Sequence, residues 1–517
     1  EYHYKLYSDY FSHIDNWMMQ EELPMLYNQY KITIPHVFVY NIELRGKDYI
    51  QVKQRDSSIH ATEREGSSAG GVSKDFTVSA QETTFISRNL PAIRQDESYC
   101  WCPEDYKVQV SFDLQGTQFT PNEYKPYSQK WEDVDKQLLK PENTQFGEHL
   151  SLTNPFRPET KQAYNSEMNF EEKIICAFQV LKKKMAWNGR YQLYSKELEK
   201  VIKKGSGSNA DLNFILISIL KDFGLEAYPV VMSRRSSGML PYNFPSLQKL
   251  NTFFVAIHDI NKQKYVFLDS SMDVPAFNIL PLELSVNKAR MLSLKEKEEK
   301  KWVNVMALSH NKSFMKIDAR IEGNQVKGHR STVLYGQEAI EYQANENHKQ
   351  DNLVSNPENK VSQKEKLTVT NLKVKKQEND WALIEEEFDF VLQADRTDDH
   401  LYINPMLFPQ LKSNPFIQTE RVLPIEFPYP YKFTMLSTLT LPEGYEVEEL
   451  PQSQSIRSEG DGLQCKYMIQ QQGNTILLNY VFHLKGYIFL SEQYKQLQEL
   501  WAKVIEKNNA LIVLKKI

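Results

Sequence analysis

The chain has 517 residues and a formal net charge of −5; 41% of its residues are hydrophobic and 25% are charged. This length favours roughly three or four domains. The negative charge, without a long basic run, argues against a general nucleic-acid binder. No apolar stretch reaches the roughly 18 residues that can span a bilayer, so no transmembrane segment is expected.

The first part of the chain, residues 1–148, is predicted to be a β-sandwich-like domain. Polar and apolar side chains alternate from Tyr106 to Leu114, as in a strand with one covered face. The segment Asp56–Lys74 is rich in Ser, Gly and charge, which predicts a mobile loop. The opening residues Glu1–Lys5 are not typical of a signal peptide, so we expect either a cytosolic protein or one whose leader was removed.

Four cysteines are too few for a disulfide framework, and they do not form paired CxxC zinc motifs. Cys100 and Cys102 are expected on one strand face, with a disulfide or half of a metal site as alternatives. Cys176 falls inside an apolar helical stripe, which predicts a buried structural thiol. The histidines are scattered, and the acidic run Asp395–His400 lacks EF-hand spacing, so we expect a solvated turn there, with a calcium site as the alternative. No metal and no cofactor are expected.

The middle of the chain changes from strand periodicity to helical periodicity. Asn169 and Glu172 form a capping-box pattern that predicts a helix start. A short second helix is expected to end at Gly205. A long apolar helix follows the turn Gly205–Asn209 and ends near Gly224. Three strands are then predicted, at Glu226–Met232, Thr252–His258 and Lys264–Asp269, the last two joined as a hairpin.

This order of elements resembles the core of the transglutaminase-like superfamily, which has a papain-type fold, most specifically over Trp187–Ser271. In that superfamily a Gly-x-Cys turn opens the long helix, a histidine begins a later strand, and an aspartate ends the next one. The matching segments here are Gly207-Ser208-Asn209, Asn251–Val255 and Tyr265–Ser271. The resemblance implies that the cysteine position holds Asn209, the histidine position holds Thr252, and only the aspartate is kept, as Asp269.

The chemistry of the triad explains why these replacements matter. A thiol at a helix N-terminus is favoured as a thiolate, a histidine deprotonates it, and an aspartate orients the imidazole. An amide is a poor nucleophile and a threonine hydroxyl is not a base near neutral pH, so no catalytic residue is predicted. Serine catalysis by Ser206 or Ser208 lacks a base, because His258 lies roughly 20 Å along the strand from Thr252 and is expected to be an ordinary exposed residue.

The same positions have structural alternatives. Asn209 is expected to be a helix N-cap, Asp269 to tie down a turn at a strand end, and Trp187 to line the core or groove. The functional alternative is a ligand site formed by Trp187, Ser208, Asn209, Thr252 and Asp269.

The rest of the chain is predicted to be β-rich, with a polar exposed loop at Gln343–Lys366 and a helix capped by Ser491. Leu90–Tyr99 and Leu441–Tyr445 resemble parts of β domains that flank such modules in bacterial envelope proteins; the leading domain is expected to lack its first strands. We therefore predict an α+β protein: a β-sandwich at 1–148, a transglutaminase-like domain at 149–295 and an antiparallel β-sandwich at 296–517.

Three functions remain open from the sequence. The first is a non-catalytic protein of the periplasm or cell envelope that binds a peptide, glycan or protein partner. The second is an active cysteine peptidase or transglutaminase with a displaced site; Cys176, mid-helix, counts against it. The third is a purely structural module with a filled groove. Nucleic acid is not expected as a partner, and a cytoplasmic location stays open.

Overall fold

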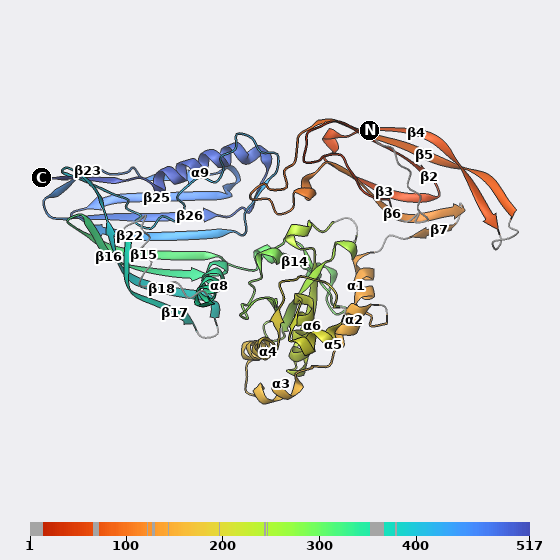
Figure 1. Ribbon diagram of the computed structural model, residues 1–517, viewed down its shortest axis with the longest axis horizontal. Coiled ribbons are helices and arrows are strands. Elements are labelled where there is room, and N and C mark those ends of the chain that lie inside the picture. Colours follow the sequence, from red (N-terminus) through yellow and green to blue (C-terminus); the bar gives the residue numbers. More distant parts are fainter. Residues whose placement is uncertain are drawn as a thin grey trace. The chain divides into compact units, whose positions relative to one another are not determined.

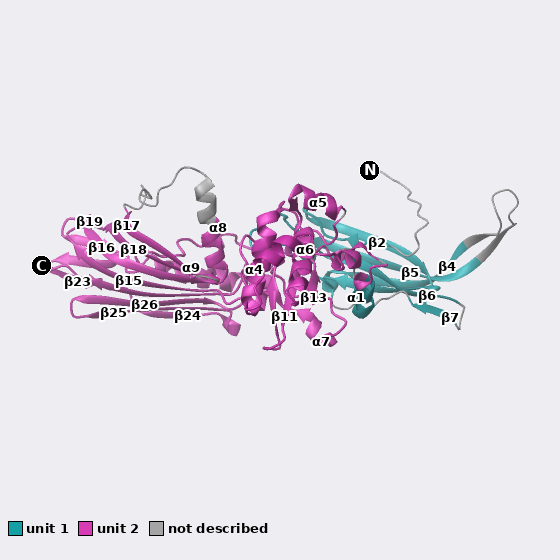
Figure 2. Cartoon of the chain, turned by 90° about the horizontal axis from the view of Figure 1, so that it is seen from below, with its two compact units in different colours: residues 1–137, 236–248 teal, residues 138–235, 249–517 magenta. Residues whose placement is uncertain are grey.

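The computed structural model describes residues 14–65, 72–120, 123–126, 130–142, 144–195, 197–241, 245, 247–351, 367–377 and 380–517. The chain divides into two compact units, one of residues 1–137 and 236–248 and the other of residues 138–235 and 249–517 (Figure 2). Both units are rich in strands, and most of the helices lie in the first half of the second unit (Figure 1). The division into three domains stays a prediction.

The first unit contains two small sheets that share one hydrophobic core. One sheet has the order β1-β6-β3 with β7 added to β6, and the other has the order β2-β5-β4. The shared core includes Phe85 and Leu90 from β5, Val110 from β6, and Val108, which directly precedes β6. The strands are β1 (Trp17–Met18), β2 (Met25–Pro35), β3 (Phe38–Arg45), β4 (Gln51–Glu65), β5 (Val72–Leu90), β6 (Gln109–Thr120) and β7 (Glu123–Pro126).

Two predictions in this unit are wrong. The expected loop Asp56–Lys74 is largely the hairpin of β4 and β5, which pair in register from Gln51↔Ile86 to Glu65↔Val72; residues 66–71 lie outside the described residues. Polar side chains are compatible with a strand when they face solvent, since the ladder itself satisfies the backbone. Cys100 and Cys102 lie before a 3₁₀ turn rather than on a strand, and neither is part of a disulfide.

The first half of the second unit contains a five-stranded antiparallel sheet of order β12-β11-β10-β13-β14, together with a group of helices. The helices are α2 (Gln145–Leu150), α3 (Arg157–Ala163), α4 (Phe170–Lys184), α5 (Leu198–Lys204), α6 (Asn209–Asp222) and α7 (Glu298–Lys301), while α1 (Trp131–Leu139) spans the division of the units. The strands are β10 (Glu226–Met232), β11 (Thr252–Asp259), β12 (Lys264–Leu268), β13 (Ala289–Met291) and β14 (Trp302–Val303). Strand β14 lies beyond residue 295, which the sequence predicted as the end of the central domain.

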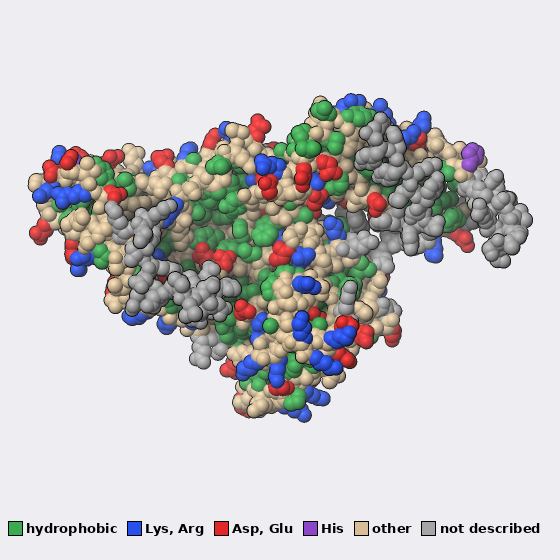
Figure 3. All heavy atoms as spheres, in the orientation of Figure 1, with side chains coloured by type: hydrophobic (Ala, Val, Ile, Leu, Met, Phe, Trp, Pro, Cys, Tyr) green, Lys and Arg blue, Asp and Glu red, His purple; other side chains and the backbone are tan. Residues whose placement is uncertain are grey.

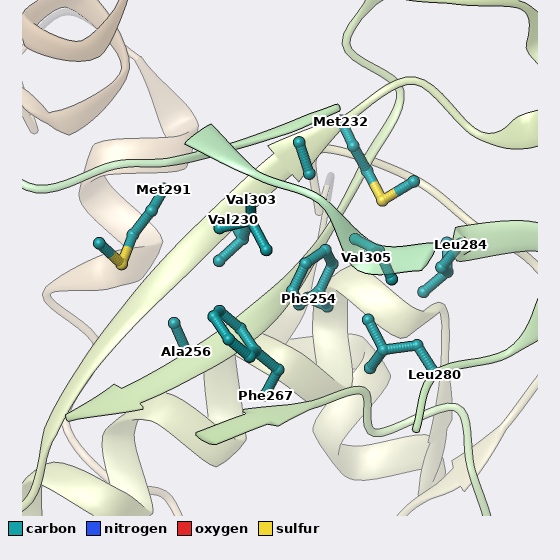
Figure 4. Packing of buried hydrophobic residues seen from close by; sticks show 11 residues of the cluster. Val230, Met232, Phe254, Ala256, Phe267, Leu280, Leu284, Met291, Val303 and Val305 are labelled. Atoms are coloured by element: carbon teal, nitrogen blue, oxygen red, sulfur yellow. The ribbon is translucent and has the colours of Figure 1, made fainter. Parts of the chain in front are cut away.

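The two faces of this sheet are covered by different parts of the chain. On one face, Phe253 of β11 packs against Phe214 of α6, with ring centroids 4.8 Å apart. On the other face, Phe254 and Phe267 pack with Leu280 and Leu284 from the segment after β12 (Figure 4). Successive residues of β11 thus point to opposite faces, and both faces are apolar, which explains the near-continuous hydrophobic run of this strand.

The last part of the chain forms an eight-stranded sheet of order β17-β18-β16-β15-β22-β26-β25-β24 and a smaller sheet of order β19-β20-β28-β23. The helices are α8 (Gln337–Asp351) and α9 (Tyr494–Asn508). The strands are β15 (Lys312–Glu322), β16 (Gln325–Tyr335), β17 (Leu367–Gln377), β18 (Asp380–Gln393), β19 (Asp395–Thr397), β20 (His400–Ile403), β22 (Tyr431–Thr440), β23 (Tyr445–Glu449), β24 (Gln454–Arg457), β25 (Leu463–Gln472), β26 (Thr475–Leu484) and β28 (Ile512–Lys516), with the short pair β21 (Ile425–Glu426) and β27 (Ile488–Phe489).

The prediction of a wholly antiparallel sheet is wrong here. Strands β15 and β22 pair in parallel, from Lys312↔Lys432 to Arg320↔Thr440. A parallel pair needs a long crossover connection, and the chain from β16 to β20 supplies it. Acidic and basic side chains are intermingled on the face of this sheet that Figure 3 shows. In α9, Trp501 packs against Phe482 of β26, so the predicted inner stripe of this helix faces the sheet.

The predicted exposed loop at Gln343–Lys366 is wrong in its first part. Helix α8 continues to Asp351, and Gln343 is buried with its Nε2 donating to the carbonyl oxygen of Trp381 at 2.7 Å. A polar helix of this composition has no apolar stripe to reveal it in the sequence. Residues 352–366 lie outside the described residues.

Candidate functional site

The long helix α6 begins at a capping box made by Ser208, not by Asn209. The Ser208 hydroxyl accepts from the backbone N–H of Asp211, and the Asp211 carboxylate accepts from the backbone N–H of Ser208 at 2.8 Å. The prediction that Asn209 is the N-cap is therefore wrong by one residue. Serine caps a helix as well as asparagine does, and it has an acidic partner three residues later.

Because Ser208 provides the cap, the side chain of Asn209 is directed toward the sheet. Its Nδ2 donates to Thr252 Oγ1 at 2.8 Å and to the carbonyl oxygen of Phe253 at 3.0 Å, and lies 3.5 Å from Asp269 Oδ2. Its Oδ1 accepts from the backbone N–H of Gln192 at 3.0 Å. The structure thus brings the side chains of Asn209, Thr252 and Asp269 together. That they are remnants of a catalytic triad stays a prediction.

The carboxylate of Asp269 is fully provided with donors. Oδ1 accepts from the backbone N–H of Ser271 at 2.9 Å and from its hydroxyl, and Oδ2 accepts from Asn213 Nδ2 at 2.9 Å. Burial raises the pKa of the Asp269 carboxyl, and the hydrogen bonds from Ser271 and the two asparagines oppose that rise. A carboxylate with these partners can remain in the interior without an imidazole beside it.

Asn213 is the fourth member of this cluster, and the sequence analysis missed it. Besides Asp269, its Nδ2 donates to the carbonyl oxygen of Phe253 at 2.8 Å, and its Oδ1 accepts from the backbone N–H of Ser270 at 3.0 Å and from the Ser270 hydroxyl. The missed signal was spacing. Asn213 lies one helical turn after Asn209 in a largely apolar helix, so both amides lie on the same face of α6.

The cluster is closed to solvent in this structure. Asn209 and Thr252 are 0% exposed, and Ser208 and Asp269 are each 1% exposed. The segment after β8 (Ala186–Trp187) lies against the cluster. The backbone carbonyl oxygen of Arg190 accepts from the backbone N–H of Asn209 at 3.1 Å. Among the residues proposed for ligand binding, only Trp187 is partly exposed. The other four are buried, so a ligand does not reach them in this structure.

The remaining sequence candidates have partners of their own. Trp187 Nε1 donates to the carbonyl oxygen of Arg190 at 3.1 Å, and its ring centroid lies 5.1 Å from that of Tyr191. His258 was expected to be exposed but is half-buried; it stacks on Tyr265 at 4.9 Å, and its Nδ1 lies 3.3 Å from Glu226. The turn at Asp395–His400 belongs to no group of three metal-ligand side chains in the part of the chain that the structure describes.

The four cysteines form no disulfide, and burial raises the pKa of two of them, which makes these thiols less reactive. Burial raises the pKa of Cys176, whose Sγ donates to the carbonyl oxygen of Ala163 at 3.6 Å. Burial also raises the pKa of Cys465 to about 11. Reactive thiols are found where positive charge or a helix N-terminus lowers the pKa instead.

Comparisons with known proteins give three findings. A family described as a domain of unknown function with a solved structure (DUF3858) matches residues 399–514, which is under a quarter of the chain. A crystal structure of a candidate protease from Parabacteroides distasonis is similar at 13% identity and a TM-score of 0.49, over 97% of this chain and 74% of that one. A candidate cysteine protease from Cytophaga hutchinsonii covers 48% of this chain and 80% of its own at 11% identity, with a TM-score of 0.17.

Neither structural similarity is close enough to carry an argument about this chain. No curated protein sequence matches it. Among the described residues, no helix is long and apolar enough to cross a membrane.

Proposed function

We propose that this chain is a non-catalytic protein whose transglutaminase-like module holds a structural polar cluster in place of a catalytic triad. In this proposal the protein acts as a binding or structural module of the bacterial cell envelope, with a peptide, glycan or protein partner. The envelope location is supported only by the resemblance of the sequence to envelope proteins. The observation that carries the absence of catalysis is the hydrogen bonding of Asn209.

Asn209 occupies the first turn of α6, where the superfamily has its thiol. Both halves of its amide are engaged: Nδ2 donates to Thr252 and to Phe253, and Oδ1 accepts from Gln192. An amide nitrogen shares its lone pair with the carbonyl group, so it offers no nucleophilic electron pair even when it is exposed. The positive end of the helix dipole, which would favour a thiolate here, has no ionisable group at this position to act on.

The position of the base is equally unsuited to catalysis. Thr252 offers a hydroxyl that already accepts from Asn209 at 2.8 Å, and a hydroxyl does not take up a proton near neutral pH. The hydroxyl of Ser208 is not available as a nucleophile, because it donates to Asp211 Oδ2 at 2.8 Å and serves as the helix cap. Serine needs an imidazole-type base, and no hydrogen bond among the described residues links Ser208 to a histidine.

The alternative function, a displaced cysteine peptidase or transglutaminase, needs a different thiol. Cys176 is the cysteine within the module, and it lies in the middle of α4 with a pKa raised by burial. A raised pKa leaves the sulfur as a thiol at neutral pH, which is the unreactive form. The alternative therefore has less support than a non-catalytic role.

The test is an assay of acyl transfer on the full chain. Incubation with casein and with short glutamine-containing peptides, plus a fluorescent primary amine, should yield neither hydrolysis nor amine incorporation. A papain-type protease run in parallel shows that the substrates are competent. Turnover that disappears after alkylation of Cys176, and that a Cys176→Ala variant also lacks, would overturn the proposal.

A further inference from the structure

A cavity of about 680 Å³ lies in the C-terminal part of the second unit, in a place that the sequence analysis did not single out. We call it the C-terminal groove. Side chains of β15, β16 and β18 form its floor, and residues of the segment 404–412 form its wall. Cavities of roughly 300–1,000 Å³ are typical of small-ligand sites. The central polar cluster, by contrast, has no exposed surface to offer a ligand.

The floor is built from neighbouring strands in a fixed register. Arg330 and Thr332 lie two residues apart on β16, so they share one face of the sheet. Arg330 is opposite Phe388 and Thr332 is opposite Glu386 on β18, while Met315 of β15 is opposite Thr332 from the other side. These side chains therefore line the groove from three adjacent strands.

An aromatic sandwich holds the guanidinium of Arg330 in place. Its Cζ lies 4.4 Å from the ring centroid of Phe388 and 5.0 Å from that of Phe408. Its charge is neutralised by Glu386 at 2.5 Å, and Glu386 also accepts from the hydroxyl of Tyr342 at 2.8 Å. The half-buried ring of Phe408 remains in the wall as an apolar surface against which a ligand ring can pack.

Two hydrogen-bonding atoms of the floor have no partner. Arg330 Nε and Thr332 Oγ1 are buried and meet none among the residues that the structure describes. Thr332 is only 3% exposed. A buried polar group without a hydrogen bond costs about 1–3 kcal/mol, so these two atoms make the floor less stable than one whose polar atoms are all paired. In the central cluster the corresponding threonine, Thr252, has its partner inside the protein.

The lining chemistry favours a neutral, hydroxyl-rich ligand. Two cations, Arg330 and Lys412, are matched by two carboxylates, Glu386 and Asp395, so the groove has no net charge to attract an ion. Several of the other lining side chains are uncharged amides: Gln393, Asn404, Gln410 and Asn509. The last three also bond within the protein, so Gln393 is the amide best placed to bond a ligand. An amide both donates to and accepts from a hydroxyl group, a carboxylate accepts from it, and an aromatic ring packs against the C–H face of a sugar ring.

A peptide fits this groove less well than a sugar does. Extended peptides usually bind by adding a strand to a free sheet edge. The three floor strands have no free edge, because β18 lies between β17 and β16, β16 between β18 and β15, and β15 between β16 and β22. Recognition must therefore be made by side chains rather than by the sheet backbone.

We propose that the C-terminal groove binds a neutral oligosaccharide, with the aromatic ring of Phe408 against a sugar face and Asp395 and Gln393 bonded to its hydroxyl groups. This inference is independent of the proposed absence of acyl transfer, since the groove and the central cluster share no residue. Asp395 is exposed and lies on the short strand β19, so it can be replaced without disturbing a core.

The experiment is a calorimetric titration of the full chain with neutral oligosaccharides of two to four units: malto-, cello- and N-acetylglucosamine oligomers. Uncharged tetrapeptides and sulfated dextran oligomers form the comparison arms. At least one neutral series should bind saturably, and Asp395→Ala should weaken that binding about 10-fold, as expected when a charged hydrogen-bond partner is lost. Gln393→Ala should weaken it less, about 3-fold, as for an uncharged partner.

Asp399→Ala is the matched control, because Asp399 belongs to the same acidic run but does not line the groove. It should change the dissociation constant by less than about twofold, as for an ordinary surface substitution. The proposal fails if no neutral saccharide binds, if peptides or sulfated oligomers bind in preference, or if Asp395→Ala and Asp399→Ala have equal effects.

Discussion

Two regions of the second unit bury polar side chains in opposite ways. Around Asp269, the donors of Asn209, Asn213 and Ser271 meet acceptors within the protein, and the cluster has no room for a ligand. Around Thr332, a cavity of about 680 Å³ lies against hydrogen-bonding atoms that have no partner among the described residues. Both regions include a buried threonine on a strand, so the difference lies in what surrounds the hydroxyl.

This difference separates a polar cluster that stabilises the fold from one that is available for binding. A network that satisfies itself makes the structure more rigid and gains nothing from a ligand. A floor with missing partners is less stable by itself, and the accessible side chains beside it are left to bond a ligand. The sequence resemblance favours a site in the first region, whereas the cavity and its lining residues favour a site in the second.

The largest expected effect comes from removing Asn213, the residue that ties α6 to the segment after β12. Asn213→Ala removes one hydrogen bond from the Asp269 carboxylate, which keeps the donors of Ser271, and leaves the backbone N–H of Ser270 without its partner. We expect the opening free energy of α6 to fall by about 3 kcal/mol, since a hydrogen bond to a charged group contributes about 1.5–3 kcal/mol and an orphaned buried group costs about 1–3 kcal/mol. Hydrogen exchange of the α6 backbone amides, followed by mass spectrometry, measures this value.

Ser218→Ala is the matched control for that experiment. Ser218 is also buried on α6, but its hydroxyl donates only to the carbonyl oxygen of Ile215 in its own helix, at 2.7 Å. Alanine favours the helix, so this variant should differ from the wild type by less than about 1 kcal/mol. Equal losses in the two variants would show that Asn213 is no more than an ordinary buried residue, and the structural role of the cluster would have no basis.

A smaller effect is expected from Thr252→Val, which keeps the branched shape and removes the hydroxyl. The Nδ2 of Asn209 loses an acceptor at 2.8 Å but retains the carbonyl oxygen of Phe253 at 3.0 Å. The loss should therefore be about 1 kcal/mol, the contribution of one hydrogen bond without a stranded partner. The same exchange measurement on β11 and α6 tests this expectation, and a loss comparable to that of Asn213→Ala would contradict it.

The free energy of unfolding should also depend on pH through the ionisation of Asp269. Burial raises its pKa above that of an ordinary aspartate. Below pH of about 4 the carboxyl is protonated in both the folded and unfolded chain, and its contribution to stability is fully present. That contribution is lost as the pH rises through the raised pKa of the folded protein, because the unfolded chain ionises first.

The side chain of the Asp269→Asn variant cannot ionise. The free energy of unfolding of the wild type minus that of this variant should therefore fall as the pH rises from about 4 to 7. Thermal unfolding of both proteins at matched pH values measures this difference. A difference that grows with pH would mean that the hydrogen bonds from Ser271 and Asn213 outweigh the cost of burial, and that the carboxylate is the favoured form.

Several elements of the central part could be predicted from the sequence to within a residue or two, although α3, β13 and β14 were not predicted. Strand β10 was placed at Glu226–Met232, and the capping box of Asn169 and Glu172 marks the start of α4 as expected. These elements have strong local signals: caps, a helical stripe and a buried strand. The parallel pairing of β15 with β22 had no such signal, since the partners are more than 100 residues apart in the chain.

The site was predictable only where a motif marked it. Asn209, Thr252 and Asp269 were brought together by the resemblance, but Asn213 was hidden because an isolated polar residue in an apolar helix does not reveal its partner. The C-terminal groove could not be found at all. Its lining comes from positions as distant as Met315 and Asn509, and the missing hydrogen bonds of Thr332 exist only in three dimensions.

The smallest expected effect is also the one that separates the two regions most directly. Thr332→Val makes the same chemical change as Thr252→Val, on a residue that is almost as deeply buried. The Thr332 hydroxyl has no hydrogen-bond partner to lose among the described residues, and valine removes a buried polar atom that is costly to leave unpaired. Stability should therefore stay within about 0.5 kcal/mol of the wild type, or rise. Chemical denaturation of the two valine variants side by side is the measurement. If Thr332→Val costs as much as Thr252→Val, the Thr332 hydroxyl has a partner in solution, such as an ordered water, and its place in the floor no longer distinguishes the groove from the central cluster.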